Sequence, residues 1–418
     1  MSSTGARRRP AVLVAYAAFI LVGLSTGVAG VLLPAQILDY GVDKATVGIT
    51  FFTFSAGFLL AGITAGGLMH RLGTRTALVV GGGAFVAAAL YTAVRPPFLA
   101  FVAVQVLAGY GIGVLESVLN AYLSELPGAT TLLNRLHAFF GVGALLGPAL
   151  AAWMLRALPW TAVWLVLALA SLPLVAGFLL SYPARALPDD GRDARGPDPG
   201  VGTGDGSGSG TAEPTTRGSS TAGGGLLGTA VRQPAVLLAA VFLAVYVGLE
   251  ISVGNWGFSL LVDGYGQQAV LAGYTVSGYW LGLTAGRFLI SPIAVRIGLT
   301  PAGMTTACLT GVTASAVLTW LSPAPVLASA GLVLLGFFLG PIFPTAMAMV
   351  PLLTSARLVP TAIGVLNGVS VVGGAVLPWL AGAIAQGVGV WTLLPFTLAL
   401  ALAQLAIWWR LARRVVPG

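Results

Sequence analysis

Residues 98–123 read FLAFVAVQVLAGYGIGVLESVLNAYL, an apolar run that contains one carboxylate, Glu116. A helix needs roughly 20 apolar residues to cross a bilayer, so this run predicts a transmembrane helix. A charge near the centre of such a helix costs about 2.5–3.5 kcal/mol on insertion scales, and it usually faces a bundle interior or a wet cavity. The sequence therefore predicts a functional site at Glu116, on a pathway through the membrane.

The composition of the whole chain agrees with a membrane location. Of its 418 residues, 57% are hydrophobic and 8% are charged. Soluble domains carry about 25% charged residues, so this chain could not cover its own surface in water. The single cysteine, Cys308, excludes an internal disulfide, and helix packing alone must hold the fold. We expect no cleavable signal peptide, because the first apolar segment is too long and lacks a small-residue cleavage site.

Twelve apolar stretches predict twelve transmembrane helices in an all-α membrane protein. We place them at residues 11–33, 46–69, 76–94, 98–123, 132–155, 160–182, 235–260, 268–290, 302–320, 325–350, 360–386 and 390–411. Residues 183–233 are rich in Gly, Ser, Thr, Pro and Asp, and such a segment is predicted to be a disordered linker. Residues 1–182 and 234–418 then form two six-helix bundles, the pattern of two parallel repeats.

The distribution of basic residues predicts the orientation of the chain. Cytoplasmic loops carry an excess of Lys and Arg. With the N-terminus in the cytoplasm, only Lys44, Arg95 and Arg156 lie on the outer side. Both termini and the linker are then cytoplasmic, in a multi-pass protein of the cytoplasmic (inner) membrane. The net charge of +8 reflects this topology, and we expect no nucleic-acid partner.

A glycine motif repeats in the two halves. Gly62-Ile-Thr-Ala-Gly66 in the second predicted helix recurs as Gly282-Leu-Thr-Ala-Gly286 in the eighth. Small residues four apart let helices approach closely in lipid, so both motifs are predicted to be helix-packing sites at matching positions. The chain also has prolines inside predicted spans, where we expect helix kinks: Pro148, Pro341, Pro344 and Pro378.

A family resemblance appears after the second predicted helix. The sequence there reads Gly66-x-Leu68-x-His70-Arg71-x-Gly73-x-Arg75. It resembles the loop signature of the major facilitator superfamily, G-x-L-x-D-R-x-G-R-R, with histidine at the acidic position and threonine at the penultimate one. The resemblance implies the major facilitator fold, two six-helix bundles, for nearly the whole chain. It also implies a gating-loop role for Gly66, His70, Arg71, Gly73 and Arg75.

A narrower resemblance lies in the fourth predicted helix. The run Gly111-Ile-Gly113-Val-Leu-Glu116-Ser-Val-Leu-Asn120 is similar to the G-x-x-x-x-E-x-x-x-N pattern of the fucose permease branch. Parts of the fifth, seventh and tenth predicted helices resemble the same group. In that branch the fourth-helix glutamate is implicated in proton-coupled sugar uptake, and the resemblance implies this role for Glu116. The acidic residue of that branch's first helix is absent, and Ser25, Thr26 and Gln36 are the polar residues there.

Proton-coupling candidates follow from the residues themselves. Glu116 and Glu250 are the two acidic residues well inside predicted helices, one in each half. An apolar cavity disfavours the charged form of a carboxyl group, so each could take up a proton at one face and release it at the other. His137 is the third candidate, as a proton relay. The alternative for each is a side chain satisfied by a neighbouring helix.

Polar residues near these acids are the substrate-binding candidates. Asn120 lies one helical turn from Glu116, and Asn134 shares a helix face with His137. Tryptophan stacks on sugar rings, although it is also common in the interfacial belt of membrane proteins. For Asn134 and Asn367, helix capping or packing is the alternative role. The predicted substrate-binding set is Glu116, Asn120, Asn134, His137, Asn255, Trp256 and Asn367.

These features predict a secondary active transporter that moves a small polar solute by alternating access. By resemblance the solute is a sugar, in symport with protons; sodium coupling and facilitated diffusion are alternatives. Gly143-x-x-x-Gly147-Pro148 is similar to part of an antiporter signature, so proton-coupled efflux of a drug or metabolite is the alternative transport function. A membrane receptor or scaffold is the alternative that does not transport. We find no phosphate-binding loop, metal-ligand cluster or catalytic triad, and we expect a monomer that is not an enzyme and holds no metal or cofactor.

Overall fold

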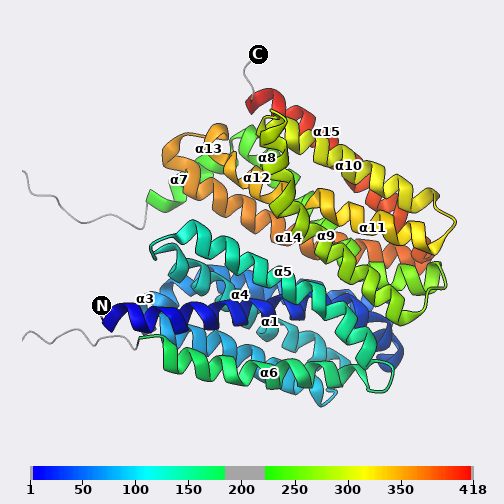
Figure 1. Ribbon diagram of the computed structural model, residues 1–418, viewed down its shortest axis with the longest axis horizontal. Helices are drawn as coiled ribbons and strands as arrows, with labels where there is room; N and C mark the ends of the chain where they lie inside the picture. The colour runs from blue at the N-terminus through cyan, green and yellow to red at the C-terminus, as the bar shows by residue number, and fades with distance from the viewer. Residues whose placement is uncertain (1–2, 184–221, 416–418) are drawn as a thin grey trace, which may run out of the picture.

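The computed structural model describes residues 3–183 and 222–415, and all regular secondary structure in those residues is helical (Figure 1). The first half of the chain forms one bundle and the second half forms another. The N-terminal bundle consists of α1 (Ser3–Tyr40), α2 (Lys44–Val47), α3 (Ile49–Ala93), α4 (Phe98–Ser124), α5 (Ala129–Met154) and α6 (Trp160–Ser181).

The C-terminal bundle is more interrupted than the first. Its longer helices are α7 (Ala222–Val231), α8 (Pro234–Ser259), α9 (Ala269–Arg296), α10 (Pro301–Leu321), α11 (Pro325–Leu339), α14 (Val359–Gly387) and α15 (Leu393–Val415). Its short elements are the π-helix η1 (Leu260–Gly264), α12 (Ile342–Ala348), α13 (Val350–Leu353) and the 3-10 helices η2 (Ala356–Leu358) and η3 (Val390–Thr392).

The described residues contain ten helices long and apolar enough to cross a membrane. One of these, Lys44–Ala93, has 50 residues and contains both the second and the third predicted helices. Helix α9 is not among the ten, but it has 28 residues and packs against α5 and α11 in the place of the eighth predicted helix. The predicted all-α membrane fold of two bundles is therefore confirmed.

Helix α3 turns back on itself at Gly73, the residue at which we predicted a loop. Gly73 has φ 81° and ψ 161°, a backbone conformation that favours glycine. Both limbs of α3 then pack closely on α4. A Cβ added at Gly57 would collide with the Val106 carbonyl, and one added at Gly81 would lie 2.8 Å from the Val114 side chain. The predicted loop of residues 70–75 is thus a sharp bend in the chain.

The structure departs from the predicted helix pattern at two places in the C-terminal half. The predicted linker 183–233 includes α7, which folds because its apolar end packs on α8 and α14, with Ala230 fully buried. Residues 184–221 of that linker lie outside the described residues. The predicted helix 325–350 is divided after Leu339, where Pro341 has no N–H to continue the helix. Pro148 and Pro378 lie inside α5 and α14, which continue through them.

Close helix pairs within each bundle cross at glycines, and the pairs correspond between the two halves. Helices α9 and α11 meet at Gly282 and Gly286, where added Cβ atoms would collide with the backbone of Val333 and Phe337. The corresponding pair in the first half, α3 and α4, meets instead at Gly57 and Gly109.

The prediction that Gly62-xxx-Gly66 is a packing motif is therefore wrong. An added Cβ at either residue would have no atom within 4 Å, and both glycines are exposed. They lie past the crossing with α4, on the part of α3 that approaches the bend at Gly73. Glycine spacing alone does not determine which part of a helix meets its neighbour, so the matching position in the second half gave the wrong packing site in the first.

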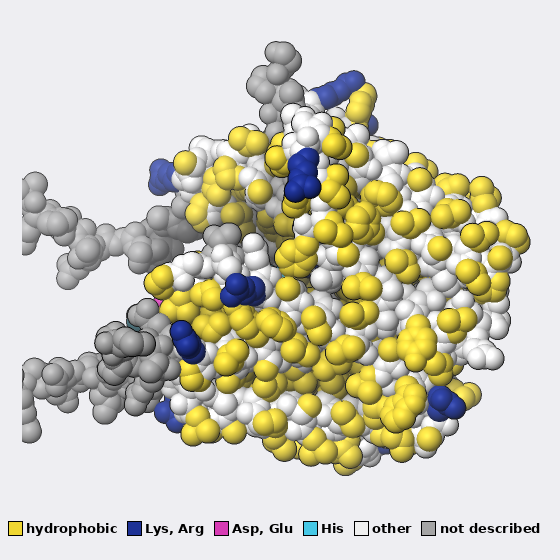
Figure 2. Space-filling model, viewed as in Figure 1, with side chains coloured by type: hydrophobic (Ala, Val, Ile, Leu, Met, Phe, Trp, Pro, Cys, Tyr) yellow, Lys and Arg dark blue, Asp and Glu magenta, His cyan; other side chains and the backbone are white. Residues whose placement is uncertain are grey.

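The outer surface suits a lipid environment. Figure 2 shows hydrophobic side chains spread over most of the visible face of both bundles, with isolated Lys and Arg side chains among them. Large apolar side chains on this surface are well exposed, for example Ile63 at 80% and Leu180 at 86%. A soluble protein rarely exposes apolar area on this scale, whereas lipid tails accept it.

Candidate functional site

The helix ends form two groups, which we call the distal end and the termini end. The distal end carries the chain segments at residues 40–48, 155–160, 263–269 and 387–393. The termini end carries the start of α1, the bend of α3, the start of α5 and the end of α9. In Figure 1 the helices of the two bundles lie against each other at the distal end and diverge toward the termini end.

At the distal end, α1 packs directly on α8. A Cβ at Gly30 would lie 2.6 Å from the Asn255 Cα, so the two backbones are as close as glycine permits. Trp256, next along α8, makes an edge contact with Phe51 of α3, with ring centroids 6.3 Å apart. Its Nε1–H donates to the Pro378 carbonyl at 2.7 Å. These contacts bring both bundles together at one level.

A second distal contact joins the segment before α3 to α14. The Lys44 backbone N–H donates to the Gln386 Oε1 at 3.1 Å. About two turns further along each element, Phe52 packs at an edge to Trp379, with ring centroids 5.7 Å apart. Because these residues belong to different bundles, the two contacts hold the distal end closed on this side as well.

Helices α5 and α9 form the third contact between the bundles. The Ala149 N–H donates to the Ser277 hydroxyl at 3.1 Å. Nearer the termini end, a Cβ at Gly141 would collide with the Thr284 side chain. The two helices run antiparallel, so the residues one turn past this contact, toward the termini end, are His137 on α5 and Arg287 on α9.

Beyond that level the bundles separate. Asn134 and His137 on α5 and Asn367 on α14 are exposed. Added Cβ atoms at Gly364 and Gly368 of α14 would have no atom within 4 Å. The structure is therefore closed between the bundles at the distal end and open at the termini end.

A partly buried ion pair lies at the level where the bundles part. Arg287 of α9 and Glu250 of α8 are 4.0 Å apart between Nη2 and Oε1, with side chains 26% and 12% exposed. The Arg287 Nε–H donates to the Gly340 carbonyl at 3.2 Å, at the break after α11. The pair is held by three helices of the C-terminal bundle.

Two tyrosines surround this pair, and both hydroxyls donate to backbone carbonyls. Tyr246 donates to the Leu339 carbonyl, and Tyr279 donates to the Glu250 carbonyl, each at 3.0 Å. Tyr246 also lies near enough to interact with the Glu250 carboxylate and the Arg287 guanidinium. The charge of Arg287 acts as well on the His137 imidazole of the facing bundle. The N-terminal bundle therefore contributes one titratable group to this cluster.

Glu116 has a different setting in the N-terminal bundle. Its side chain is partly buried, and among the described residues its carboxylate has no hydrogen-bond or ion-pair partner. The Asn120 Nδ2 donates to the Glu116 backbone carbonyl at 2.8 Å. The amide predicted to share a face with Glu116 is thus engaged with the helix backbone.

The other predicted site residues are divided between the two ends. The ring of His137 packs at an edge to Phe19, with centroids 5.6 Å apart. Asn255 and Trp256, at 9% and 3% exposure, lie inside the closed distal contact. Among the predicted gating residues, Gly66, His70 and Arg71 are exposed beside the bend of α3, and Gly73 and Arg75 are partly exposed. The structure therefore does not bring the predicted substrate-binding set together around one cavity.

Sequence reasoning missed Arg287, which is central to the observed cluster. Its signal was available, because a buried arginine within a predicted span is as costly as a carboxylate. It lies three residues before the predicted end of the helix 268–290. Basic residues are common at the cytoplasmic ends of transmembrane helices, so an arginine at this position does not stand out in the sequence.

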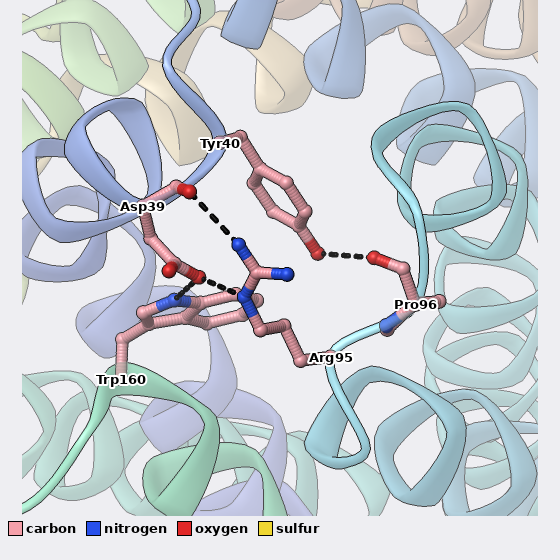
Figure 3. Close-up of polar contacts among 5 residues, drawn as sticks. All are labelled: Asp39, Tyr40, Arg95, Pro96 and Trp160. Atoms are coloured by element: carbon pink, nitrogen blue, oxygen red, sulfur yellow. Dashed lines mark hydrogen bonds and ion pairs between the residues drawn. The ribbon is translucent and has the colours of Figure 1, made fainter.

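Away from the Glu250–Arg287 cluster, five residues form a second cluster that we call the distal node (Asp39, Tyr40, Arg95, Pro96 and Trp160; Figure 3). The Asp39 Oδ2 accepts hydrogen bonds from the Arg95 Nε–H at 2.7 Å and the Trp160 Nε1–H at 2.9 Å. Tyr40 donates to the Pro96 carbonyl at 2.9 Å. These bonds join the end of α1, the segment after α3 and the start of α6, and they hold Arg95 at φ 54°.

The family comparison agrees with this architecture. The model of the Major Facilitator Superfamily matches residues 15–325, well over half of the chain. The chain belongs to the Major Facilitator Superfamily. It is therefore a transporter of that superfamily, and the resemblance seen at residues 66–75 is confirmed at this level.

Related sequences in the superfamily carry several different names. "Bypass of stop codon protein 6" of Saccharomyces cerevisiae is 24% identical over 410 residues, which is 96% of this chain and 82% of that protein. A "Multidrug resistance protein B homolog" of Mycobacterium tuberculosis is 31% identical over 134 residues, 31% of this chain and 25% of that protein. A "Gallate transporter" of Pseudomonas putida is 29% identical over 172 residues, 40% of this chain and 38% of that protein.

Solved structures of superfamily transporters share the fold. A bacterial homologue of the human lysosomal transporter Spinster, in an inward-facing, unoccupied conformation, has a TM-score of 0.73 at 13% identity, covering 99% of this chain and 98% of that one. The E. coli fucose:proton symporter has a TM-score of 0.61 at 17% identity, covering 97% of this chain and 98% of that one. These likenesses confirm the major facilitator fold, while the fucose permease branch stays a prediction.

Proposed function

We propose that this transporter moves a small polar solute by alternating access and couples the movement to protons. The observation that carries the proposal is the position of the Glu250–Arg287 pair, one turn past the last contact between the bundles. A site at that level can be covered from either end when two bundles rock against each other. Buried ionisable groups in a membrane protein favour a role in binding or proton transfer.

The proton-coupling role proposed for Glu116 can be tested in proteoliposomes. Replacing Glu116 with Gln removes the titrating group and keeps the side chain's shape. We expect this variant to lose proton-driven accumulation by about tenfold or more while retaining part of its counterflow exchange, because only net movement needs the proton to be released. Radiolabelled galactose, galacturonate and 4-hydroxybenzoate, with an acid-outside pH gradient, are the trial solutes.

Glu125 provides a matched control for that test. It lies at the end of the same helix and is exposed, so Glu125→Gln is expected to leave accumulation unchanged. Full accumulation by the Glu116→Gln variant would remove Glu116 from the coupling scheme. A gradient that empties the vesicles instead of loading them would favour the efflux alternative.

The arginine distribution supports an orientation with the termini end in the cytoplasm. Cys308 is 2% exposed, so an introduced cysteine can report sidedness with a membrane-impermeant maleimide. We expect Arg156→Cys at the distal end to be labelled in intact cells and Arg296→Cys at the termini end only after permeabilisation. Both arginines are exposed, which makes them a matched pair. The reverse labelling pattern would invert the proposed orientation.

The solute itself is less constrained than the transport mechanism. The fold of the fucose:proton symporter supports the sugar prediction. Two of the predicted sugar ligands, Asn255 and Trp256, are buried in the closed distal contact, and the Asn120 amide is bonded to its own helix. The names of the partial relatives, a multidrug resistance homologue and a gallate transporter, favour other solutes. The charge of Arg287 narrows the class of solute further.

A further inference from the structure

The guanidinium of Arg287 has hydrogen-bonding capacity that the protein does not use. Of its five N–H groups, the Nε–H donates to the Gly340 carbonyl. The Glu250 Oε1 is 4.0 Å from Nη2, which is too long for a hydrogen bond. Within the described residues, the Tyr246 hydroxyl oxygen is the one further group close enough to accept from the guanidinium, and it cannot serve all four N–H groups of the terminal nitrogens. The Arg287 side chain is 26% exposed, so these N–H groups can be reached by a ligand that supplies acceptors, and hydrogen bonds to a charged group are among the stronger ones.

The neighbouring groups supply only part of those acceptors. The Tyr279 hydroxyl donates to the Glu250 carbonyl, and the Tyr246 hydroxyl donates to the Leu339 carbonyl while its oxygen lies beside the guanidinium. Facing this level from α5 is His137, which the Arg287 charge influences across the gap. The bundles separate on the termini side of these groups, so a small solute can approach Arg287 from that end. The guanidinium is the part of the cluster left to bind it.

A carboxylate is the group that fits this site best. The flat guanidinium fork matches the two oxygens of a carboxylate and binds them through parallel hydrogen bonds. Charge balance adds a condition, because Arg287 and ionised Glu250 together are neutral. An added anion would leave the cluster negative unless Glu250 takes up a proton, and an uncompensated charge in a membrane interior is costly.

We propose that the solute is a small organic acid whose carboxylate binds Arg287 in place of Glu250, while Glu250 takes up one proton from the water at the open end. The cluster is neutral before and after this exchange, so acid and proton enter as an electroneutral pair. The titratable groups that face Glu250 are Tyr246 on its own helix and Arg287 and Tyr279 on α9, with His137 opposite on α5. This inference rests on the proposed function, since it names the solute and the coupling step of the same site.

Binding of matched ligand pairs to the purified full-length protein tests the proposal without requiring transport. The pairs are galacturonate with galactose and 4-hydroxybenzoate with 4-hydroxybenzamide, which differ mainly in the carboxylate. We expect one acid or both to bind the wild type at pH 6, measured by calorimetry and by the shift in melting temperature. The neutral partner should bind about tenfold or more weakly, since hydrogen bonds to charged groups contribute about 1.5–3 kcal/mol.

Three variants separate the roles of the charged groups. Arg287→Gln is expected to lose acid binding by about tenfold to a hundredfold. Arg296→Gln, an exposed arginine on the same helix, is expected to bind as the wild type does. Glu250→Gln mimics the protonated pair, so it should bind the acid at least as tightly as the wild type, with affinity that no longer falls as the pH rises.

Several results would overturn the proposal. They are equal affinity for an acid and its neutral partner, acid binding that survives Arg287→Gln, loss of acid binding in a folded Glu250→Gln protein, and failure of both acids to bind. Proton-driven accumulation of galactose but not of galacturonate would keep the proposed function and reject the organic acid. Arg287-dependent acid binding without any transport in proteoliposomes would keep the organic acid as the ligand and reject the proposed transport function.

Discussion

Replacing Gly30 with alanine is expected to shift the protein out of the distally closed conformation and to lower its transport rate by about tenfold or more. The added Cβ would lie 2.6 Å from the Asn255 Cα and from the Gly254 carbonyl oxygen, both backbone atoms of the other bundle. A backbone cannot move aside as a side chain does, so the bundles must separate. Overpacking of this kind costs about 1–3 kcal/mol, and about 1.4 kcal/mol changes an equilibrium tenfold.

The shift can be measured as a distance between the bundles. Spin labels on cysteines at Arg156 and Val388, which are exposed at the distal end of different bundles, should move apart in the Gly30→Ala protein. Gly62→Ala is the matched control, because it adds the same methyl group at a position where the new Cβ would have no atom within 4 Å. Wild-type transport together with an unchanged label distance in Gly30→Ala would show that the contact between α1 and α8 does not control the closure.

Replacing Gly286 with alanine is expected to destabilise the C-terminal bundle itself. An added Cβ would collide with the Phe337 carbonyl oxygen, where α9 crosses α11 within that bundle. Separating two packed helices exposes the contacts on both sides of the crossing. We expect the melting temperature in detergent to fall by roughly 5 °C or more, or the folded protein to be lost on expression.

The position of Gly66 provides an unusually direct comparison. It corresponds to Gly286 in the sequence repeat, and its added Cβ would meet nothing within 4 Å. Gly66→Ala should therefore melt at or slightly above the wild-type temperature, since alanine favours a helix over glycine by about 1 kcal/mol. Equal destabilisation by the two substitutions would contradict the different packing of the two halves.

Hydropathy was sufficient to predict the fold because the bilayer imposes it. Backbone groups in lipid must be hydrogen-bonded within a helix or a closed barrel, and an uninterrupted apolar stretch of about 20 residues fits a helix. This physical constraint explains the confirmed bundles on either side of the linker. It says little about short amphipathic or apolar elements, and α7 was accordingly assigned to the linker. It also does not predict where a span is interrupted, as happens after α11 ends at Leu339.

The candidate site was predictable only as separate residues. Glu116 and Glu250 are conspicuous because charges are rare in spans, and both lie inside helices as expected. Which groups meet depends on the rotation and crossing of helices distant in the sequence. The pairing of Glu250 with Arg287 and the contact between Gly141 and Thr284 arise in this way. The same helix crossings bury Trp256, and no local sequence pattern predicts their geometry.

The distal node has a consequence for how the motion of this protein can be followed. The Asp39 carboxylate at the end of α1 binds the segment before α4 and the start of α6, so these three points should keep their mutual distances while the bundles rock. A pair of probes placed across the node would then serve as an internal ruler. If a distance between the bundles changes while this one stays constant, the bundles have rocked. If both distances change, the protein has loosened in detergent.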